Sequence, residues 1–180
     1  MDSTFMQRVA EGVAASGVRV IRFEFPYMQR RRETGKRGAP DPPRILVQSF
    51  RDAIEEVGDD TALVIGGKSM GGRIASMVAD DAGVRGVLCL GYPFHPPGKA
   101  EKTGTKHLET MRTPTLILQG TRDSFGSPYE VRTYQLSPAV RVEWLEDGDH
   151  SFKPRARSGR TEADNIGAAI ALVTEFILSR

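Results

Sequence analysis

The stretch Gly67-Lys68-Ser69-Met70-Gly71 decides the fold class, because a strand-like run leads into it and a helical pattern follows it. The run at residues 62–65 is continuously apolar, as in a strand covered on both faces, and a helix is expected from position 71 to about 81. A serine between glycines at such a turn is the pattern of a nucleophile elbow. We expect Gly67 and Gly71 to be required sterically, because neighbouring Cβ atoms would clash in a strained turn. The N–H of Met70 would then lie at a helix N-terminus, where it can bind an oxyanion.

Two other interpretations of these residues remain open. Gly67-Lys68-Ser69 also matches the end of the phosphate-loop pattern G-x-x-x-x-G-K-[ST], but the first glycine of that pattern would fall on Ala62. The residues between are strand-like, which disfavours a nucleotide-binding loop. A glycine-rich turn without any chemistry is the other interpretation. The strand before the serine and the helix after it favour the elbow.

Strand-like and helical patterns alternate along the rest of the chain. Strands are predicted at residues 18–25, 86–90, 115–118 and 140–145. Helices are predicted over residues 5–13, over 46–57, from the Ser127-Pro128 start signal, and over 161–178. This alternation predicts an α/β fold with a mostly parallel sheet and helices on both faces. Residues 1–180 form a single domain in this interpretation, because no inner boundary is visible.

Composition narrows the class of protein. The 180 residues carry 25 Lys and Arg against 23 Asp and Glu, a net charge of +2 that argues against a nucleic-acid or membrane-surface partner. Cys89 is the only cysteine, which excludes an internal disulfide and a cysteine-built metal site and fits a reducing compartment. No targeting or membrane-spanning segment is visible, so a cytoplasmic location is expected. The sequence leaves the oligomeric state open, a homo-oligomer included.

Two further residues complete a candidate catalytic set with Ser69. Asp123 follows the strand predicted at 115–118, and His150 follows the one predicted at 140–145. Carboxyl ends of parallel strands meet at one edge of a sheet, so all three side chains are expected there. A serine needs a base and an orienting acid to act as a nucleophile. Asp147 and Asp149 are rival acids, but both are too close to His150 in sequence to orient its ring easily.

Other polar and basic residues have weaker claims. We expect His95, Lys68 and Tyr27 to lie at the rim of a substrate pocket, and His107 to be a loop residue. The basic run between Arg30 and Arg37 is expected to be a solvated loop, or alternatively an anion-attracting rim beside the site. The remaining two candidates, Cys89 and Trp144, lie in predicted strands and are expected to be packing residues.

Several motifs together resemble a known family. They are Gly67-Lys68-Ser69-Met70-Gly71-Gly72-Arg73, Arg22-Phe23-Glu24-Phe25-Pro26-Tyr27, Gly91-Tyr92-Pro93-Phe94-His95-Pro96 and Gln119-Gly120-Thr121-Arg122-Asp123. The chain resembles the small bacterial serine α/β-hydrolases related to the dienelactone-hydrolase-like group. It is also similar to the hydrolase-like domains of a testis-expressed protein and of a nonspecific-lethal chromatin-complex subunit. The resemblance implies the α/β-hydrolase fold and a triad on Ser69, Asp123 and His150, without a defined substrate.

The front of the chain departs from this family. Members normally begin with strands, the last of which ends in a His-Gly-Ala-Gly-like loop that supplies a second oxyanion N–H. Here Met1-Asp2-Ser3-Thr4-Phe5-Met6 resembles the first turn of the helix that follows that loop. The strand beside the elbow strand and the oxyanion loop are therefore expected to be missing, through a misassigned start or a genuine short form. Loss of one oxyanion donor typically lowers the rate by about 10²–10³.

These observations predict a serine hydrolase that acts on a small-molecule acyl substrate, namely an ester, thioester or amide. Ser69 is the expected nucleophile, His150 the base and Asp123 the orienting acid; no metal and no organic cofactor are implied. The alternative is a hydrolase-fold binding or interaction module with weak or no catalysis. An intact serine, aspartate and histidine set argues against that alternative.

Overall fold

Four parallel strands form the sheet in the computed structural model of the chain, which describes residues 3–36, 38–58 and 62–180. The strands are β1 (Val64–Lys68), β2 (Gly86–Leu90), β3 (Thr115–Gly120) and β4 (Val140–Leu145), in the spatial order β1-β2-β3-β4. Their register pairs Gly67 with Cys89 and Cys89 with Ile117. Every residue of β3 is buried, as expected for an interior strand covered on both faces.

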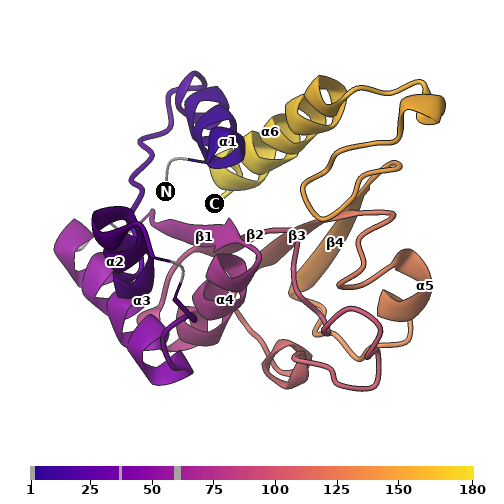
Figure 1. Cartoon of the computed structure of the whole chain (residues 1–180). Coiled ribbons are helices and arrows are strands. Elements are labelled where there is room, and N and C mark those ends of the chain that lie inside the picture. Colours follow the sequence, from indigo (N-terminus) through magenta and orange to yellow (C-terminus); the bar gives the residue numbers. More distant parts are fainter. Residues whose placement is uncertain (1–2, 37, 59–61) are drawn as a thin grey trace.

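Helices cover both faces of the sheet, as predicted (Figure 1). On one face, α3 (Pro43–Val57) and α4 (Met70–Ala82) pack on each other, and α4 contacts β1 and β2. On the other face, α1 (Thr4–Ala14) packs against α6 (Glu162–Leu178), which reaches β3 and β4. Two separate hydrophobic clusters fill these two layers. The sheet is therefore held from both sides, and its carboxyl edge is left for loops.

Capping contacts confirm three of the predicted helix starts, while the helix predicted from residue 46 begins earlier, at Pro43, without a side-chain cap. Ser3 caps α1, and Ser127 and Thr161 each form a capping box at the start of α5 (Pro128–Val131) and α6. The strand predicted at 62–65 starts two residues later and ends three residues later, because the ladder with β2 runs through Gly66 and Gly67 to Lys68. Within the described residues, none of the helices combines the length and the apolar character needed to cross a bilayer.

The strand predicted at residues 18–25 is wrong, because this extended segment joins no ladder. Its alternating pattern has another cause: the Phe23 and Phe25 rings pack on the Phe50 ring of α3, with ring centroids 4.9 and 6.2 Å apart. Val20 and Ile21 stay exposed, at 39% and 52% of their surface. Packing of alternate side chains on a helix thus gave the segment the two-residue hydrophobic period of a strand. Among the described residues, β1 pairs only with β2.

The arginines at 30–32 are exposed to solvent, as predicted, but they lie in a helix and not in the predicted loop. Pro26 begins α2 (Pro26–Thr34), and Gly35 ends it in the left-handed conformation. Position 37, the end of the predicted loop, lies outside the described residues. Arg30, Arg31 and Arg32 contact residues that lie close to them in the chain. These contacts are Arg30 with Asp41, Arg31 with the carbonyl of Gly38 and the ring of Tyr27, and Arg32 with Glu24.

Candidate active site

Ser69 lies in a strained turn between β1 and α4, as the sequence predicts. Its φ of 53° and ψ of −116° are rare for a residue with a side chain. Its N–H donates to the carbonyl of Leu90 at 3.0 Å, and its own carbonyl accepts from the N–H of Arg73 at 3.1 Å. The turn is therefore fixed to β2 on one side and to α4 on the other. Strain of this kind persists where the surrounding structure enforces it.

The glycines that make this turn tight differ in part from those predicted. A Cβ on Gly67 would lie 2.8 Å from the carbonyl carbon of Gly71, and one on Gly72 would lie 2.7 Å from the carbonyl oxygen of Gly67. A Cβ on Gly71 would meet open space in the described part of the chain. The close approach is thus between Gly67 and the first turn of α4, with Gly72 as the second required glycine. The steric requirement predicted for Gly71 is wrong.

A pair of matched substitutions tests this assignment. Gly67→Ala is expected to lower the free energy of unfolding by about 1–3 kcal/mol, because backbone atoms of α4 would have to move. Gly71→Ala is expected to be neutral or to stabilise by up to about 1 kcal/mol, since alanine is the better helix former. Urea unfolding of the two variants and the native chain measures both. Equal losses in the two variants would contradict the assignment.

The structure brings Ser69, His150 and Asp123 together at the carboxyl edge of the sheet. His150 Nε2 lies 2.9 Å from Ser69 Oγ, and His150 Nδ1 lies 2.7 Å from Asp123 Oδ2. Ser69 follows β1, Asp123 follows β3 and His150 follows β4. The three side chains form one continuous path of hydrogen bonds across the sheet.

The Asp123 carboxylate is buried and fully engaged. Its residue exposes 1% of its surface. Oδ1 accepts from the N–H of Phe125 at 2.9 Å, and Oδ2 accepts from Gln119 Nε2 at 2.9 Å as well as from His150. These donors stabilise the ionised carboxylate away from water. The arrangement fixes both the position and the direction of the carboxylate toward the imidazole.

Gln119 is a residue of the site that sequence reasoning missed. Its side chain is completely buried at the end of β3. Besides Asp123, its amide bonds the backbone of Tyr92, accepting from the N–H at 2.7 Å and donating to the carbonyl at 3.1 Å. The available signal was a single amide side chain at the end of an otherwise apolar strand. A buried amide needs partners, and here those partners are the candidate acid and the loop after β2.

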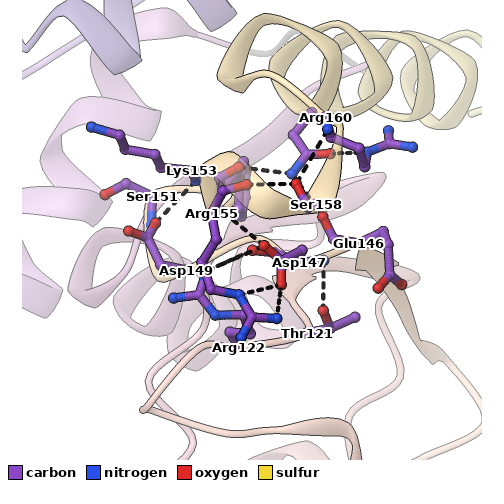
Figure 2. Close-up of polar contacts among 12 residues, drawn as sticks. Thr121, Arg122, Glu146, Asp147, Asp149, Ser151, Lys153, Arg155, Ser158 and Arg160 are labelled. Carbon is purple, nitrogen blue, oxygen red and sulfur yellow. Dashed lines mark hydrogen bonds and ion pairs between the residues drawn. The ribbon is translucent and has the colours of Figure 1, made fainter.

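The loop that carries His150 is anchored by Asp147, one of the two rival acids (Figure 2). Asp147 has a left-handed φ of 53° and binds the guanidinium of Arg155 through its carboxylate. Arg122 donates to the Asp147 carbonyl at 2.9 Å, and the N–H of Asp147 donates to Thr121 Oγ1 at 2.8 Å. The bond from Arg155 lowers the pKa of Asp147 to about 2. Asp147 therefore holds the loop after β4 against the loop after β3.

The other rival acid, Asp149, also serves the backbone of this loop. Its Oδ1 accepts from the N–H groups of Ser151 at 2.8 Å and of Lys153 at 3.0 Å (Figure 2). Neither rival contacts the imidazole in the described contacts. Among the described residues, Asp123 is the carboxylate that contacts the imidazole.

Two groups fix the His150 residue from its other sides. The Phe125 ring lies against the imidazole with centroids 4.4 Å apart, and Lys68 Nζ donates to the His150 carbonyl. The Lys68 ammonium also lies 5.4 Å from the centroid of the Phe5 ring. Burial lowers the pKa of Lys68 to about 8, although the carboxylates of Asp123 and Asp149 act in the opposite direction. Lys68, predicted at a pocket rim, is instead a largely buried support of the histidine loop.

The lowered pKa of Lys68 predicts a specific pH dependence of stability. Between pH 8 and 10.5 the folded chain holds Lys68 neutral while the unfolded chain keeps it charged, so stability rises with pH in this window. Relative to Lys68→Met, the native chain is expected to gain about 3 kcal/mol there, since one pKa unit is about 1.4 kcal/mol. Urea unfolding from pH 7 to 11 measures the difference. The exposed Lys153→Met is the control, and parallel curves for all three chains would contradict the assignment.

The other residues singled out from the sequence lie at different places relative to the candidate site. His95, predicted at a pocket rim, is buried and lines a cavity together with Phe125. Tyr27 packs in the core beside α3, and none of its described contacts reaches the candidate site. His107 is half-buried, with Nε2 2.9 Å from Ser76 Oγ. Cys89 is buried, as predicted, and its Sγ donates to the Gly72 carbonyl.

The sheet is parallel, a serine lies at a strained strand-to-helix turn after β1, and an aspartate and a histidine lie on the loops after β3 and β4. These features define a hydrolase-type α/β architecture. The model of the alpha/beta hydrolase domain family matches residues 1–178. The chain therefore belongs to the alpha/beta hydrolase domain family.

Solved structures with the same fold come from several bacteria. An alpha-beta serine hydrolase homologue from Coxiella burnetii is 19% identical, with a TM-score of 0.69, over 97% of this chain and 76% of that one. A serine hydrolase without a lid from Xanthomonas campestris is 20% identical, with a TM-score of 0.66, over 93% and 71%. The esterase domain of a Rhodothermus marinus protein is 14% identical, with a TM-score of 0.65, over 96% and 79%. At sequence identities of 14–20%, the likeness to these structures shows a shared fold and nothing more.

Proposed function

We propose that this chain is a serine hydrolase that cleaves a small ester, thioester or amide through an acyl-enzyme on Ser69. The observation that carries the proposal is the unbroken hydrogen-bond path from the Asp123 carboxylate through His150 to Ser69 Oγ, with links of 2.7 and 2.9 Å. A hydroxyl becomes a useful nucleophile when an oriented base lies within hydrogen-bond distance. The serine hydrolase homologues with the same fold support the same chemistry.

Each residue has one role in the proposed reaction. Ser69 Oγ attacks the substrate carbonyl carbon while His150 Nε2 takes its proton, and the N–H of Met70 stabilises the oxyanion that forms. His150 then gives the proton to the leaving alcohol, thiol or amine as the acyl-enzyme forms. Water, deprotonated by His150, attacks the acyl-enzyme and releases the acid. Asp123 keeps Nδ1 of His150 protonated and stabilises the imidazolium.

The proposal includes a cellular setting and a partner. A small-molecule acyl compound is the substrate, with neither nucleic acid nor membrane involved, and the enzyme works in the cytoplasm. The single buried thiol of Cys89 supports a reducing compartment.

Intact-mass measurement after incubation with a fluorophosphonate tests the proposal. The native chain is expected to gain one adduct, which peptide mapping assigns to Ser69, because only an activated serine reacts with this reagent at neutral pH. Ser69→Ala is expected to gain none, and Ser151→Ala, which removes a neighbouring exposed hydroxyl, is expected to react normally. A folded native chain that gains no adduct would overturn the proposal and favour a binding module.

A further inference from the structure

A cavity of about 240 Å³ lies beside the candidate active site. Phe125, which packs on the His150 ring, forms part of its wall. Arg73 forms another part, one helical turn beyond Ser69 in α4. Ser69 and His150 do not line the cavity themselves: Phe125 lies between it and the proposed base, and the proposed nucleophile is one helical turn before Arg73. The volume of the cavity is below the range of about 300–1,000 Å³ that drug-sized ligands occupy, so it fits a short chain.

The charges on the cavity wall are all basic. Arg73, Lys102 and His95 line it, and none of the lining residues is acidic. Glu130 lies outside the wall and faces His95, with its Oε2 3.5 Å from Nε2. Lys102 is exposed at the mouth. The wall thus presents two permanent positive charges to whatever enters.

Of the two cations on the cavity wall, Arg73 and Lys102, Arg73 has the more unusual surroundings. It is half-buried, its Nε is buried without a hydrogen-bond partner, and among the described residues no carboxylate forms an ion pair with it. Its guanidinium packs against Gly104, where a Cβ would lie 2.9 Å from Cζ. Burial lowers the pKa of the nearby His107, and the positive charge of Arg73 lowers it further. An uncompensated, partly buried cation is costly unless a ligand supplies the counter-charge.

We propose that this cavity binds a carboxylate carried by the substrate, so that the enzyme prefers short acyl compounds bearing a negative charge. Arg73 and Lys102 are the specificity-determining residues, and Phe125 separates the charged end from the reacting carbonyl. The inference rests on the proposed hydrolase function and narrows its substrate class. Guanidinium and ammonium groups together form charge-assisted hydrogen bonds to a carboxylate, which are among the stronger polar contacts in proteins.

A pair of esters that differ only in charge tests the preference. Monomethyl glutarate carries the carboxylate, and dimethyl glutarate is its neutral counterpart. The native chain is expected to hydrolyse the charged ester with a kcat/KM at least about tenfold higher, the effect of one charge-assisted contact. Arg73→Gln is expected to remove the preference, and Lys102→Gln to reduce it about threefold, while hydrolysis of the neutral ester persists. Lys99→Gln, an exposed lysine outside the wall, is the matched control.

Equal kcat/KM values for the two esters, or a preference that survives Arg73→Gln and Lys102→Gln, would overturn the inference. A binding measurement separates this failure from failure of the hydrolase proposal. Calorimetric titration of Ser69→Ala with glutarate is expected to show binding, and adding Arg73→Gln and Lys102→Gln to that variant is expected to weaken the binding at least about tenfold. Absence of binding would overturn the cavity assignment. Binding together with an unreactive native chain would leave the cavity assigned and reject the hydrolase.

Discussion

His150→Ala is expected to lower kcat/KM for a short ester by about 10⁴–10⁶, because the variant loses the only base that contacts Ser69 Oγ in the described site. The same substitution removes the acid that protonates the leaving group, so both halves of the reaction slow. The fold is expected to stay intact, since the imidazole is 24% exposed and the loop is held by its backbone contacts. Steady-state kinetics together with circular dichroism measures both quantities.

Added imidazole separates a catalytic role of His150 from a structural one. Free imidazole can occupy the space left by the side chain and take the Ser69 proton, so activity of His150→Ala is expected to rise with imidazole concentration. The native chain supplies its own base and is not expected to respond. A loss below tenfold in the variant would contradict the proposed role.

Asp123→Asn is expected to cost about 10⁴ in kcat while the substrate KM changes little. The asparagine preserves the shape of the side chain, but its amide can donate where Asp123 accepts from His150 Nδ1, so the imidazole tautomer is no longer the reactive one. The buried donors Gln119 and Phe125 would also lose their charged acceptor. The kinetic parameters over a range of pH check this result.

The matched control for Asp123→Asn is Asp149→Asn, which changes the rival acid that sequence alone left open. Asp149 binds only backbone N–H groups of its own loop in the described contacts. Its substitution is therefore expected to cost less than about tenfold, through a looser loop. Comparable losses in the two variants would reject Asp123 as the orienting acid.

The sequence was sufficient to predict the frame of this molecule because its signals are local. β2, β3 and β4 begin where they were predicted, and β1 is displaced by two residues at its start and three at its end. The glycine–serine turn specified its own strained geometry. Asp123 and His150 could be chosen because parallel strands end at one edge, which turns order along the chain into nearness in space.

The failures of prediction arose where long-range packing overrides local pattern. The segment at 18–25 alternates like a strand, yet its phenylalanines pack on Phe50 of α3. The basic run is a helix because Pro26 starts it and Gly35 ends it, although its composition is typical of a loop. Charge alone could not reveal this, since Arg30, Arg31 and Arg32 each contact a residue close to them in the chain.

The contacts that support the site could not be predicted from the sequence either, because they join residues on separate loops. Gln119 reaches Asp123 and the Tyr92 backbone at once. Asp147 joins the loops after β3 and β4 through Arg122 and Thr121. The registers of β3 on β2 and of β3 on β4 bring these groups within hydrogen-bond distance.

The strand order has a consequence for how the enzyme would fail under stress. Among the described residues, β1 and β4 are the two edge strands of the sheet. Ser69 follows one edge strand and His150 follows the other, while Asp123 follows the interior strand β3. Edges of a structure open locally at lower free energy than its centre. Local opening of either edge strand would break the contact between Ser69 and His150 while the rest of the sheet stays folded. On heating, catalytic turnover is therefore expected to be lost at a lower temperature than the secondary structure. Turnover would then report local opening of the edge strands before global unfolding.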